Sequence, residues 1–293
     1  MRKYFNMTVI ILMLAISVSY GKSDESEEKN QISGEALTNG LVFVKGGTFL
    51  MGNNGSDGNE EERPVHEVTV IDFYISKYEI TQSEWGKHMP AFYYDSGEGS
   101  NYPVYYVSWY EVLKYSNKRS IAEGLNPCYS INGSTDPDIW GASPATADEN
   151  WDAVVCNWKA NGYRMPTEAE WEYASRGGDK AQGLKFSGSN DHLKVAWMEE
   201  NSGIKLHEVG RKQANELGLY DMSGNLYEWC WDWYGEYPDS ALTNPTGPAT
   251  GKFRVERGGA WDRGVNASKV DSRYFFKPQT SYGGVGVRIA RTH

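Results

Sequence analysis

Cysteine is scarce in this chain of 293 residues, and its three cysteines follow no metal-binding pattern. The sequence has no Cys-x-x-Cys pair and no Cys/His spacing suited to zinc, so we expect no structural zinc site. In an oxidising compartment Cys128 could pair with Cys156, because each lies beside a short strand-like stretch, and Cys230 would remain single. Three buried thiols would fit the sequence equally well, so both alternatives stay open.

Runs of Lys and Arg are also missing from the sequence. The formal net charge is -10 and the isoelectric point lies near 5.1. A chain with this charge repels a phosphate backbone unless a local basic cluster offsets the repulsion. We therefore expect no nucleic-acid partner.

Long apolar runs are the third absence. The most apolar stretch, residues 7–18, is shorter than the roughly 20 residues that a membrane-spanning helix needs. It follows Arg2 and Lys3 and leads into small residues, an order typical of an export signal. We predict a signal peptide over residues 1–21 and an exported protein, located at the cell surface, in the periplasm or outside the cell.

Residues 22–40 are polar, acidic and poor in aromatic side chains, which is typical of a flexible linker. A lipid anchor would need a cysteine at the cleavage point, where Tyr20 stands, so attachment of the N-terminus to a membrane stays open. The folded part is expected to begin near Leu41 and to form one domain over residues 41–293.

Glycine and tryptophan are abundant, with 32 and 11 residues, which indicates many tight turns and large aromatic anchors. The runs 41–44 and 48–52 flank a Gly-Gly pair and predict a strand, a turn and a strand. The alternating run 65–70 predicts another strand. The stretch between Cys128 and Cys156 is rich in Asp, Ser, Pro and Gly and indicates a surface excursion of the same domain.

Three Ser/Thr-x-x-Glu boxes predict helix starts at Thr81, Ser108 and Thr167, because hydroxyl and carboxylate cap free N–H groups at a helix start. The second helix should run toward Arg119, and the third should stop at the Gly-Gly pair 177–178. These short elements predict an irregular α+β fold with little regular secondary structure.

Five sequence blocks stand out: residues 43–52 (FVKGGTFLMG), 78–81 (YEIT), 162–174 (GYRMPTEAEWEYA), 218–229 (GLYDMSGNLYEW) and 257–261 (RGGAW). In this order they resemble the formylglycine-generating-enzyme, or sulfatase-modifying-factor, domain. The resemblance implies a C-type-lectin-like fold and extends from about Leu41 to Arg291.

In active members of that family, two cysteines bind copper and oxidise a substrate cysteine to formylglycine. By position, these cysteines correspond to Arg263 and Ser268 here, and the family serine corresponds to Ala260. A guanidinium cannot ligate Cu(I), and a hydroxyl is a poor substitute for thiolate. The resemblance therefore implies that the chain is not an enzyme and needs no catalytic cofactor.

An iron-dependent branch of the superfamily relies on histidines from an additional helical domain. The five histidines of this chain form no His-x-x-x-His pair, so that chemistry is not expected. An enzyme of the superfamily with unassigned metal-dependent chemistry remains the alternative.

Residues 257–291 are similar to the variable region of diversity-generating-retroelement proteins, in which framework residues alternate with diversified ones. The similarity implies a surface-displayed or secreted ligand-binding protein whose partner is a protein or glycan on a host or neighbouring cell surface. Aromatic side chains would be the binding anchors, although Phe275 or Phe276 could instead pack in the core. The expected ligand-binding residues are Trp261, Asp262, Arg263, Gly264, Asn266, Ser268, Asp271, Ser272, Tyr274, Phe275, Phe276, Gln279, Thr280 and Tyr282.

The resemblance also implies a structural calcium site. Oxygen-only ligands on a tight loop suit a hard cation, and the alternative is a turn with a helix-capping carboxylate. A second family calcium site is expected to be lost, because Val195 stands where its Asn ligand should be. The implied ligands are the side chains of Asp221 and Glu228 and the backbone carbonyls of Gly224 and Leu226.

Overall fold

The structure, a computed structural model, describes Met1 and residues 40–56, 58–90 and 95–293 of the chain. The predicted signal peptide and nearly all of the predicted linker therefore lie outside the described residues. Gly40–His293 form one compact unit. No described helix combines the length and the apolar character needed to span a bilayer.

Short strands from distant parts of the chain build four small sheets in the described residues. Their strand orders are β1-β4-β13-β7, β11-β10-β8-β12, β2-β3-β9 and β5-β6. The strands are β1 (Leu41–Val44), β2 (Gly47–Met51), β3 (His66–Val70), β4 (Phe73–Ser76), β5 (Tyr129–Ser130), β6 (Val155–Cys156), β7 (Tyr163–Arg164), β8 (Tyr227–Trp233), β9 (Leu242–Thr243), β10 (Arg254–Arg257), β11 (Arg273–Phe276), β12 (Val285–Gly286) and β13 (Ala290–Thr292).

The predicted strand, turn and strand near the N-terminus are present, but β1 and β2 belong to different sheets. β1 pairs with β4, whereas β2 pairs antiparallel with β3. The turn between them passes against another backbone, since a Cβ on Gly46 would lie 2.4 Å from the carbonyl oxygen of Val70. The close approach requires glycine, and the turn moves the chain from one sheet to the next.

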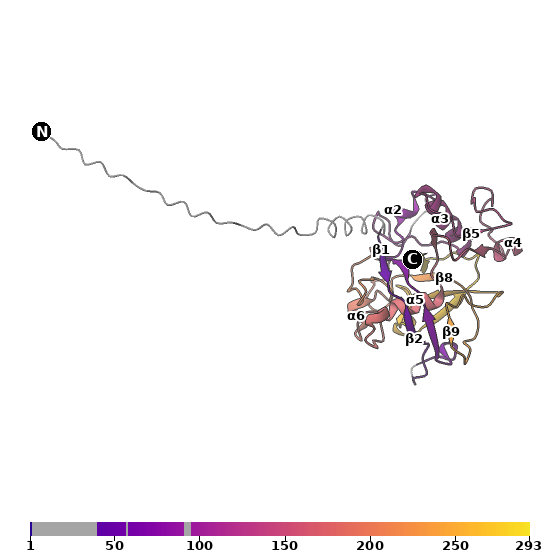
Figure 1. Ribbon diagram of the computed structural model, residues 1–293. Helices are drawn as coiled ribbons and strands as arrows, with labels where there is room; N and C mark the ends of the chain where they lie inside the picture. Colours follow the sequence, from indigo (N-terminus) through magenta and orange to yellow (C-terminus); the bar gives the residue numbers. More distant parts are fainter. Residues whose placement is uncertain (2–39, 57, 91–94) are drawn as a thin grey trace. The chain divides into compact units, whose positions relative to one another are not determined.

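The three predicted helix starts are confirmed, each with both hydrogen bonds of its capping box. The third helix ends as predicted, with Gly177 at a φ of 98° that favours glycine. Helices α2 and α3 lie at one end of the molecule, and β2 and β9 lie at the other (Figure 1). The helices are α2 (Gln82–Trp85), α3 (Trp109–Ala122), α4 (Glu149–Asp152), α5 (Glu168–Ser175) and α6 (His192–Val195), with 3-10 turns η1 (Glu60–Glu62), η2 (Gly178–Lys180) and η3 (Val265–Ser268).

Strand β8 separates the two largest groups of buried apolar residues. Trp229 packs with the aromatic residues of α3, and the next residue, Cys230, packs with the apolar face of α5. Successive residues of a strand point to opposite faces, so β8 contributes to both groups. Helix α5 packs against β8 and β10. It therefore lies directly beneath the antiparallel pair β10-β11, which we call the β10-β11 hairpin.

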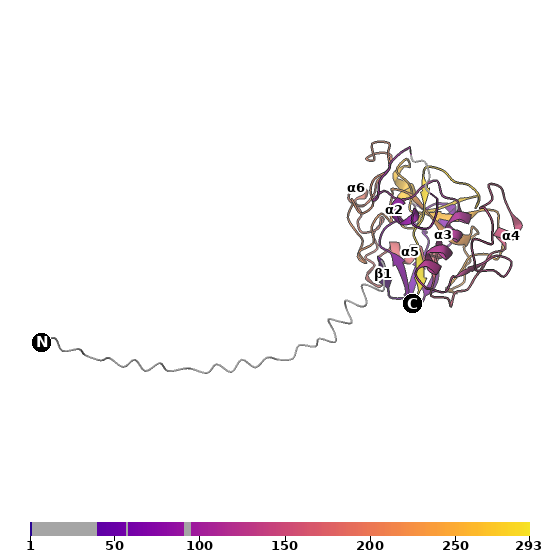
Figure 2. The same cartoon turned by 90° about the horizontal axis from the view of Figure 1, so that it is seen from above.

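The stretch between Cys128 and Cys156 forms the expected surface excursion, with the β5-β6 pair at its base. Its helix α4 lies at the rim of the molecule, on the side opposite α6 (Figure 2). All three cysteines are free and buried, and burial raises the pKa of the Cys128 thiol to about 11. The structure therefore favours the alternative of buried thiols over the 128–156 disulfide.

Candidate functional site

Strand β11 carries the aromatic residues that the sequence predicts as binding anchors, and it is an edge strand. It pairs antiparallel with β10, with Tyr274 opposite Glu256. The second neighbour of β10 is β8, so no described strand covers the outer side of β11. Every second residue of such an edge points its N–H and C=O groups away from the sheet.

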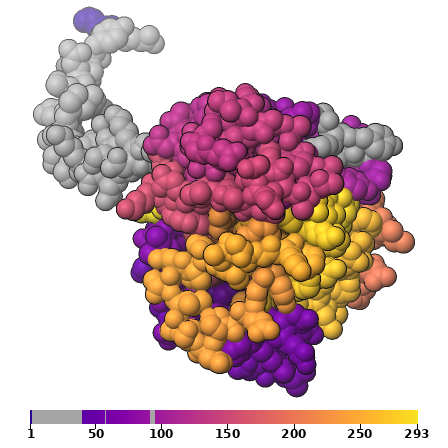
Figure 3. Space-filling model, turned by 90° about the vertical axis from the view of Figure 1, so that its right-hand side faces the viewer, coloured from indigo at the N-terminus to yellow at the C-terminus, as the bar shows by residue number. Residues whose placement is uncertain are grey.

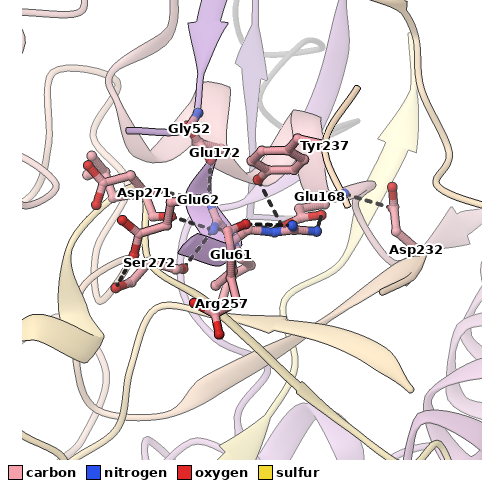
Figure 4. Close-up of polar contacts among 12 residues, drawn as sticks. Gly52, Glu61, Glu62, Glu168, Glu172, Asp232, Tyr237, Arg257, Asp271 and Ser272 are labelled. Atoms are coloured by element: carbon pink, nitrogen blue, oxygen red, sulfur yellow. Dashed lines mark hydrogen bonds and ion pairs between the residues drawn. The ribbon is translucent and has the colours of Figure 1, made fainter. Parts of the chain in front are cut away.

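Arg257 holds the loop before β11 from inside the molecule. Its buried guanidinium donates to the backbone carbonyl oxygens of Val270 (3.0 Å), Asp271 (3.0 Å) and Ser272 (2.6 Å). The same group pairs with the buried carboxylate of Glu172 on α5 (Figure 4). Burial raises the pKa of Glu172, but the guanidinium groups of Arg176 and Arg257 beside it bring that pKa below its ordinary value.

Three of the expected ligand-binding residues are buried, which corrects their assignment to an exposed face. Ser268 is fully buried, and its Oγ lies 2.5 Å from where a Cβ on Gly259 would be. Asp271 and Ser272 are also buried, because Arg257 draws their backbone inward. The hydroxyl of Ser272 donates to the carbonyl oxygen of Asn266 at 2.6 Å. These three residues belong to the framework.

Arg273, at the start of β11, ties the strand to the N-terminus of α5. Its Nε and Nη2 donate to the two oxygens of Glu168 at 2.6 and 2.8 Å. Asp232 accepts a hydrogen bond of 2.8 Å from the backbone N–H of Glu168. Burial and the neighbouring Glu168 raise the pKa of Asp232 to about 8, so this carboxyl group is largely protonated at neutral pH.

The aromatic residues of β11 divide between the two faces of the sheet. Tyr274 is 39% exposed and stacks on Tyr227, with ring centroids 5.0 Å apart. Phe275 is half-buried between other rings, the nearer being Tyr234 at 4.1 Å. Phe276 is also half-buried and packs against the buried group that contains Trp229 and the aromatic residues of α3. Tyr274 is therefore the most accessible of the three aromatic residues of β11, and the two phenylalanines pack partly into the interior.

Trp261 and Tyr282 are held by hydrogen bonds, which makes both of them partly framework residues. The indole Nε1 of Trp261 donates to the carbonyl oxygen of Gly283 at 3.1 Å. The hydroxyl of Tyr282 donates to buried Glu256 at 2.7 Å. Burial raises the pKa of Glu256 to about 8.

The remaining expected residues lie at the surface or close to it. Gly264 and Asn266 are exposed, and the others are half-buried. Arg263 lies 3.6 Å from the carboxylate of Asp262. A hollow of about 440 Å³ adjoins β11 and contains only one of these residues, Thr280; its lining residues are Phe253, Tyr274, Phe275, Phe276, Lys277 and Thr280.

A second hollow, of about 370 Å³, lies on the other side of Arg273 and was not foreseen from the sequence. Asp232 and Glu168 line it together with the apolar side chains of Trp233 and Pro248. Figure 3 shows such a hollow in the orange part of the surface, with indigo atoms of the N-terminal strands at its floor. Arg273 lines this hollow, but its side chain is buried and is held by Glu168 and by the backbone carbonyl groups of Glu61 and Gly235.

Comparison with known proteins agrees with this geometry. The family model for the sulfatase-modifying factor enzyme 1-like domain matches residues 27–293. The chain belongs to this family. It is 36% identical over 309 residues to the chaperone protein LppX of Paenibacillus barcinonensis, covering 96% of this chain and 98% of that protein. It is 28% identical to the formylglycine-generating enzyme of Streptomyces coelicolor, covering 86% of this chain and 89% of the enzyme.

Among solved structures, Treponema denticola variable protein 1 superposes on the chain with a TM-score of 0.78 and 33% sequence identity. The alignment covers 86% of this chain and 95% of that one. The predicted resemblance to the sulfatase-modifying-factor domain and to variable proteins is confirmed, as is the irregular α+β fold.

The two positions that the resemblance matches to the family's copper-binding cysteines lie in different environments here. The side chain of Arg263 is 43% exposed beside Asp262, whereas the hydroxyl of Ser268 is buried under Gly259. Neither side chain offers the soft thiolate that Cu(I) prefers. Cys230 lies in the core on β8, where burial raises the pKa of its thiol. The residues at these positions do not fit a copper site.

The carboxylate of the loop predicted to bind calcium already pairs with an arginine from the C-terminal segment of the chain. Both oxygens of Glu228 pair with Arg288, at 2.8 and 3.0 Å, and one also accepts the indole N–H of Trp171 at 2.6 Å. Asp221 is buried, its Oδ1 has no hydrogen-bond partner among the described residues, and burial raises its pKa to about 6. Asp221 fits a cation, but Arg288 would have to release Glu228, so calcium binding through these residues and the carbonyls of Gly224 and Leu226 stays a prediction.

The Trp-rich strand β8 has a structural role. Trp229 and Trp233 are buried, and Trp231 stacks on Tyr129 with ring centroids 5.4 Å apart. Arg254 lies among these rings, with its guanidinium carbon 3.4 Å from the ring centroid of Trp233, a placement that was not predicted from the sequence. Only the aromatic residues themselves were recognisable, because a buried arginine without a carboxylate partner follows no sequence motif.

Proposed function

We propose that the chain is a non-catalytic ligand-binding protein whose binding face is formed by β11 and the exposed residues of segment 261–282. The observation that carries the proposal is the contrast within this one segment. Arg257 holds the loop through backbone carbonyl groups, so neighbouring side chains can change without loss of those bonds. Tyr274 and the adjoining hollow remain open to a ligand.

Two observations support the absence of family catalysis in this proposal. Arg263 and Ser268 occupy the positions of the copper-binding cysteines, and neither can supply a thiolate. The three cysteines present are buried elsewhere. Copper-dependent oxidation of a cysteine-containing peptide by the purified chain would reject this part of the proposal and favour the enzymatic alternative.

Export to a cell surface, and diversification of the binding face, complete the proposal. They are supported by the apolar segment at residues 7–18 and by the similarity to Treponema denticola variable protein 1. The partner would then be a protein or glycan on a host or neighbouring cell. A template repeat of the 3′ end of the gene beside a reverse-transcriptase gene would support diversification.

A second candidate function is binding of a client polypeptide. It is favoured by the 36% identity to a protein named as a chaperone, which extends over 98% of that protein. The same face would serve, because Tyr274, Phe275 and Phe276 offer apolar contacts suited to an unfolded segment.

A glycan and host-protein array tests the binding face that both functions share. Wild type should bind a defined subset of probes, and the Tyr274→Ala, Phe275→Ala double variant should lose most of that binding, because aromatic anchors carry most of the energy of such faces. Ile139→Ala, at a 71% exposed position on the surface excursion, is the matched control. Equal binding by wild type and the double variant would defeat the proposed face.

A further inference from the structure

The outer edge of β11 offers a row of backbone hydrogen-bonding groups beside an aromatic hollow. No described strand pairs with this edge. An unpaired edge is a template for another strand unless it is blunted by Pro, by an inward-pointing charge or by a bulge. The first residue of β11, Arg273, carries an inward-pointing charge that is paired with Glu168, whereas residues 274–276 contain no proline or charged residue. The β10-β11 register is regular over all four pairs. Beyond Arg273, this edge therefore has no charge, proline or bulge that would prevent pairing.

The hollow beside this edge favours apolar side chains over sugars. Four aromatic rings line it, from Phe253, Tyr274, Phe275 and Phe276, together with one lysine and one threonine. No carboxylate or carboxamide lies among these lining residues, although such groups supply most of the hydrogen bonds that fix a sugar. A strand placed along β11 would direct every second side chain to the face where the hollow lies.

Two lysines lie at one end of the β10-β11 hairpin, and they favour an acidic residue in the bound ligand. Lys277 lines the hollow, and Lys252 is exposed on the segment that leads into β10. Because Arg254 is opposite Phe276, both lysines lie at the same end of the β10-β11 hairpin. An acidic residue at the matching end of a bound strand would complement them.

We propose that β11 binds an extended polypeptide segment as an added strand, with apolar side chains in the hollow and an acidic residue beside Lys252 and Lys277. The proposal rests on the proposed function and specifies the ligand class for the same face. Backbone pairing supplies affinity for any extended peptide, and the hollow and the lysines supply selectivity.

The test uses fluorescence anisotropy with the full chain and a labelled nonapeptide in which phenylalanine and threonine alternate before two terminal aspartates. Two further peptides carry N-methyl groups on the amides of one edge or of the other. We expect one N-methylated peptide to bind at least about tenfold more weakly and the other to bind like the parent, because only one edge faces β11. Absence of binding by the parent, or equal effects of the two modifications, would overturn the proposal.

Variants of the protein locate the peptide. Tyr274→Ala should weaken binding by about tenfold, whereas Ile139→Ala should leave it unchanged. The Lys252→Glu, Lys277→Glu double variant should bind the aspartate peptide more weakly and should prefer a peptide ending in two lysines. Melting temperatures confirm that each variant is folded. Unchanged peptide selectivity in the charge-reversed variant would remove the acidic residue from the proposal.

The array described for the proposed function distinguishes a failure of strand addition from a failure of the proposed binding face. Array binding that needs Tyr274 and Phe275, combined with no peptide binding, would leave the ligand-binding face in place and overturn strand addition. Glycan binding by the same face would also overturn it. Peptide binding that is insensitive to both N-methyl patterns but lost in Tyr274→Ala would show an aromatic contact without strand addition.

Discussion

Arg257 and Tyr274 lie on neighbouring strands of one hairpin, yet they are held in opposite ways. Arg257 is buried and bonded to three backbone carbonyl groups and to Glu172. Tyr274 is 39% exposed and is held mainly by stacking on Tyr227. Because Arg257 binds residues 270–272 through backbone groups rather than side chains, it fixes the path of this loop whatever residues occupy it. The binding face can therefore vary while its backbone stays constant.

Removal of the arginine should have the largest effect on stability. Arg257→Leu should cost roughly 3–5 kcal/mol of unfolding free energy, because Glu172 keeps a buried charge and the loop carbonyls lose their donor. Urea unfolding measures this loss. Arg263→Leu, which removes a half-exposed ion pair, should change stability by less than about 1 kcal/mol. Similar losses in both variants would contradict the distinction between framework and face.

Stability should also depend on pH, because the buried carboxyl group of Glu256 lies beneath the binding face. Its pKa in the folded chain is about 8, above the value of about 4.3 expected when unfolded. The folded state thus binds the extra proton between these values, and stability falls as pH rises from about 4.3 to about 8, by at most about 1.4 kcal/mol per pH unit.

Glu256→Gln should flatten this dependence, since glutamine cannot lose a proton and still accepts the Tyr282 hydrogen bond. Melting temperatures at pH 5 and pH 8 measure the effect. If the melting temperature of the variant falls between pH 5 and pH 8 by as much as that of wild type, Glu256 is not the group responsible.

Calcium binding would show that a cation, and not only Arg288, stabilises the loop 221–228. If the predicted site forms, calcium at 100 times its dissociation constant should stabilise the chain by about 2.7 kcal/mol. The melting temperature with calcium and with a chelator measures this, and Asp221→Asn should reduce the difference. Equal melting temperatures in both conditions would show that no calcium binds there and that Glu228 is held by Arg288 and Trp171 alone.

The smallest expected effect concerns the exposed anchor. Tyr274→Ala should lower the unfolding free energy by less than about 1 kcal/mol, because a single stacked and partly exposed ring is lost. Thermal unfolding measures it next to Arg257→Leu. A loss as large as that of the arginine variant would place Tyr274 in the framework.

Local motifs made part of this structure predictable from the sequence. The capping boxes at Thr81, Ser108 and Thr167 predicted three helix starts because their hydrogen bonds lie within four residues. Strand pairing was not predictable in the same way, since β1 and β2 belong to different sheets and their partners depend on contacts made far along the chain. The family resemblance supplied the fold that these local signals could not.

The candidate site was predicted in position but not in detail. Alternation of framework and variable residues pointed to segment 257–291, yet it could not show that Ser268, Asp271 and Ser272 face inward. Their burial follows from Arg257, whose partners are backbone carbonyls and leave no trace in the identity of the neighbouring residues. The edge position of β11 also depends on long-range pairing and was not visible in the sequence.

The most direct test is the tolerance to substitution of two sets of positions in the same segment. Tyr274 and Asn266 form the exposed set, and Ser268 and Asp271 form the buried set. Each position is randomised in a display library, and variants are sorted for folding and for binding to the ligand found on the array. We predict that most substitutions in the exposed set keep the fold and change binding, whereas most in the buried set lose the fold. Equal tolerance in the two sets, or unchanged binding across the exposed set, would contradict the account.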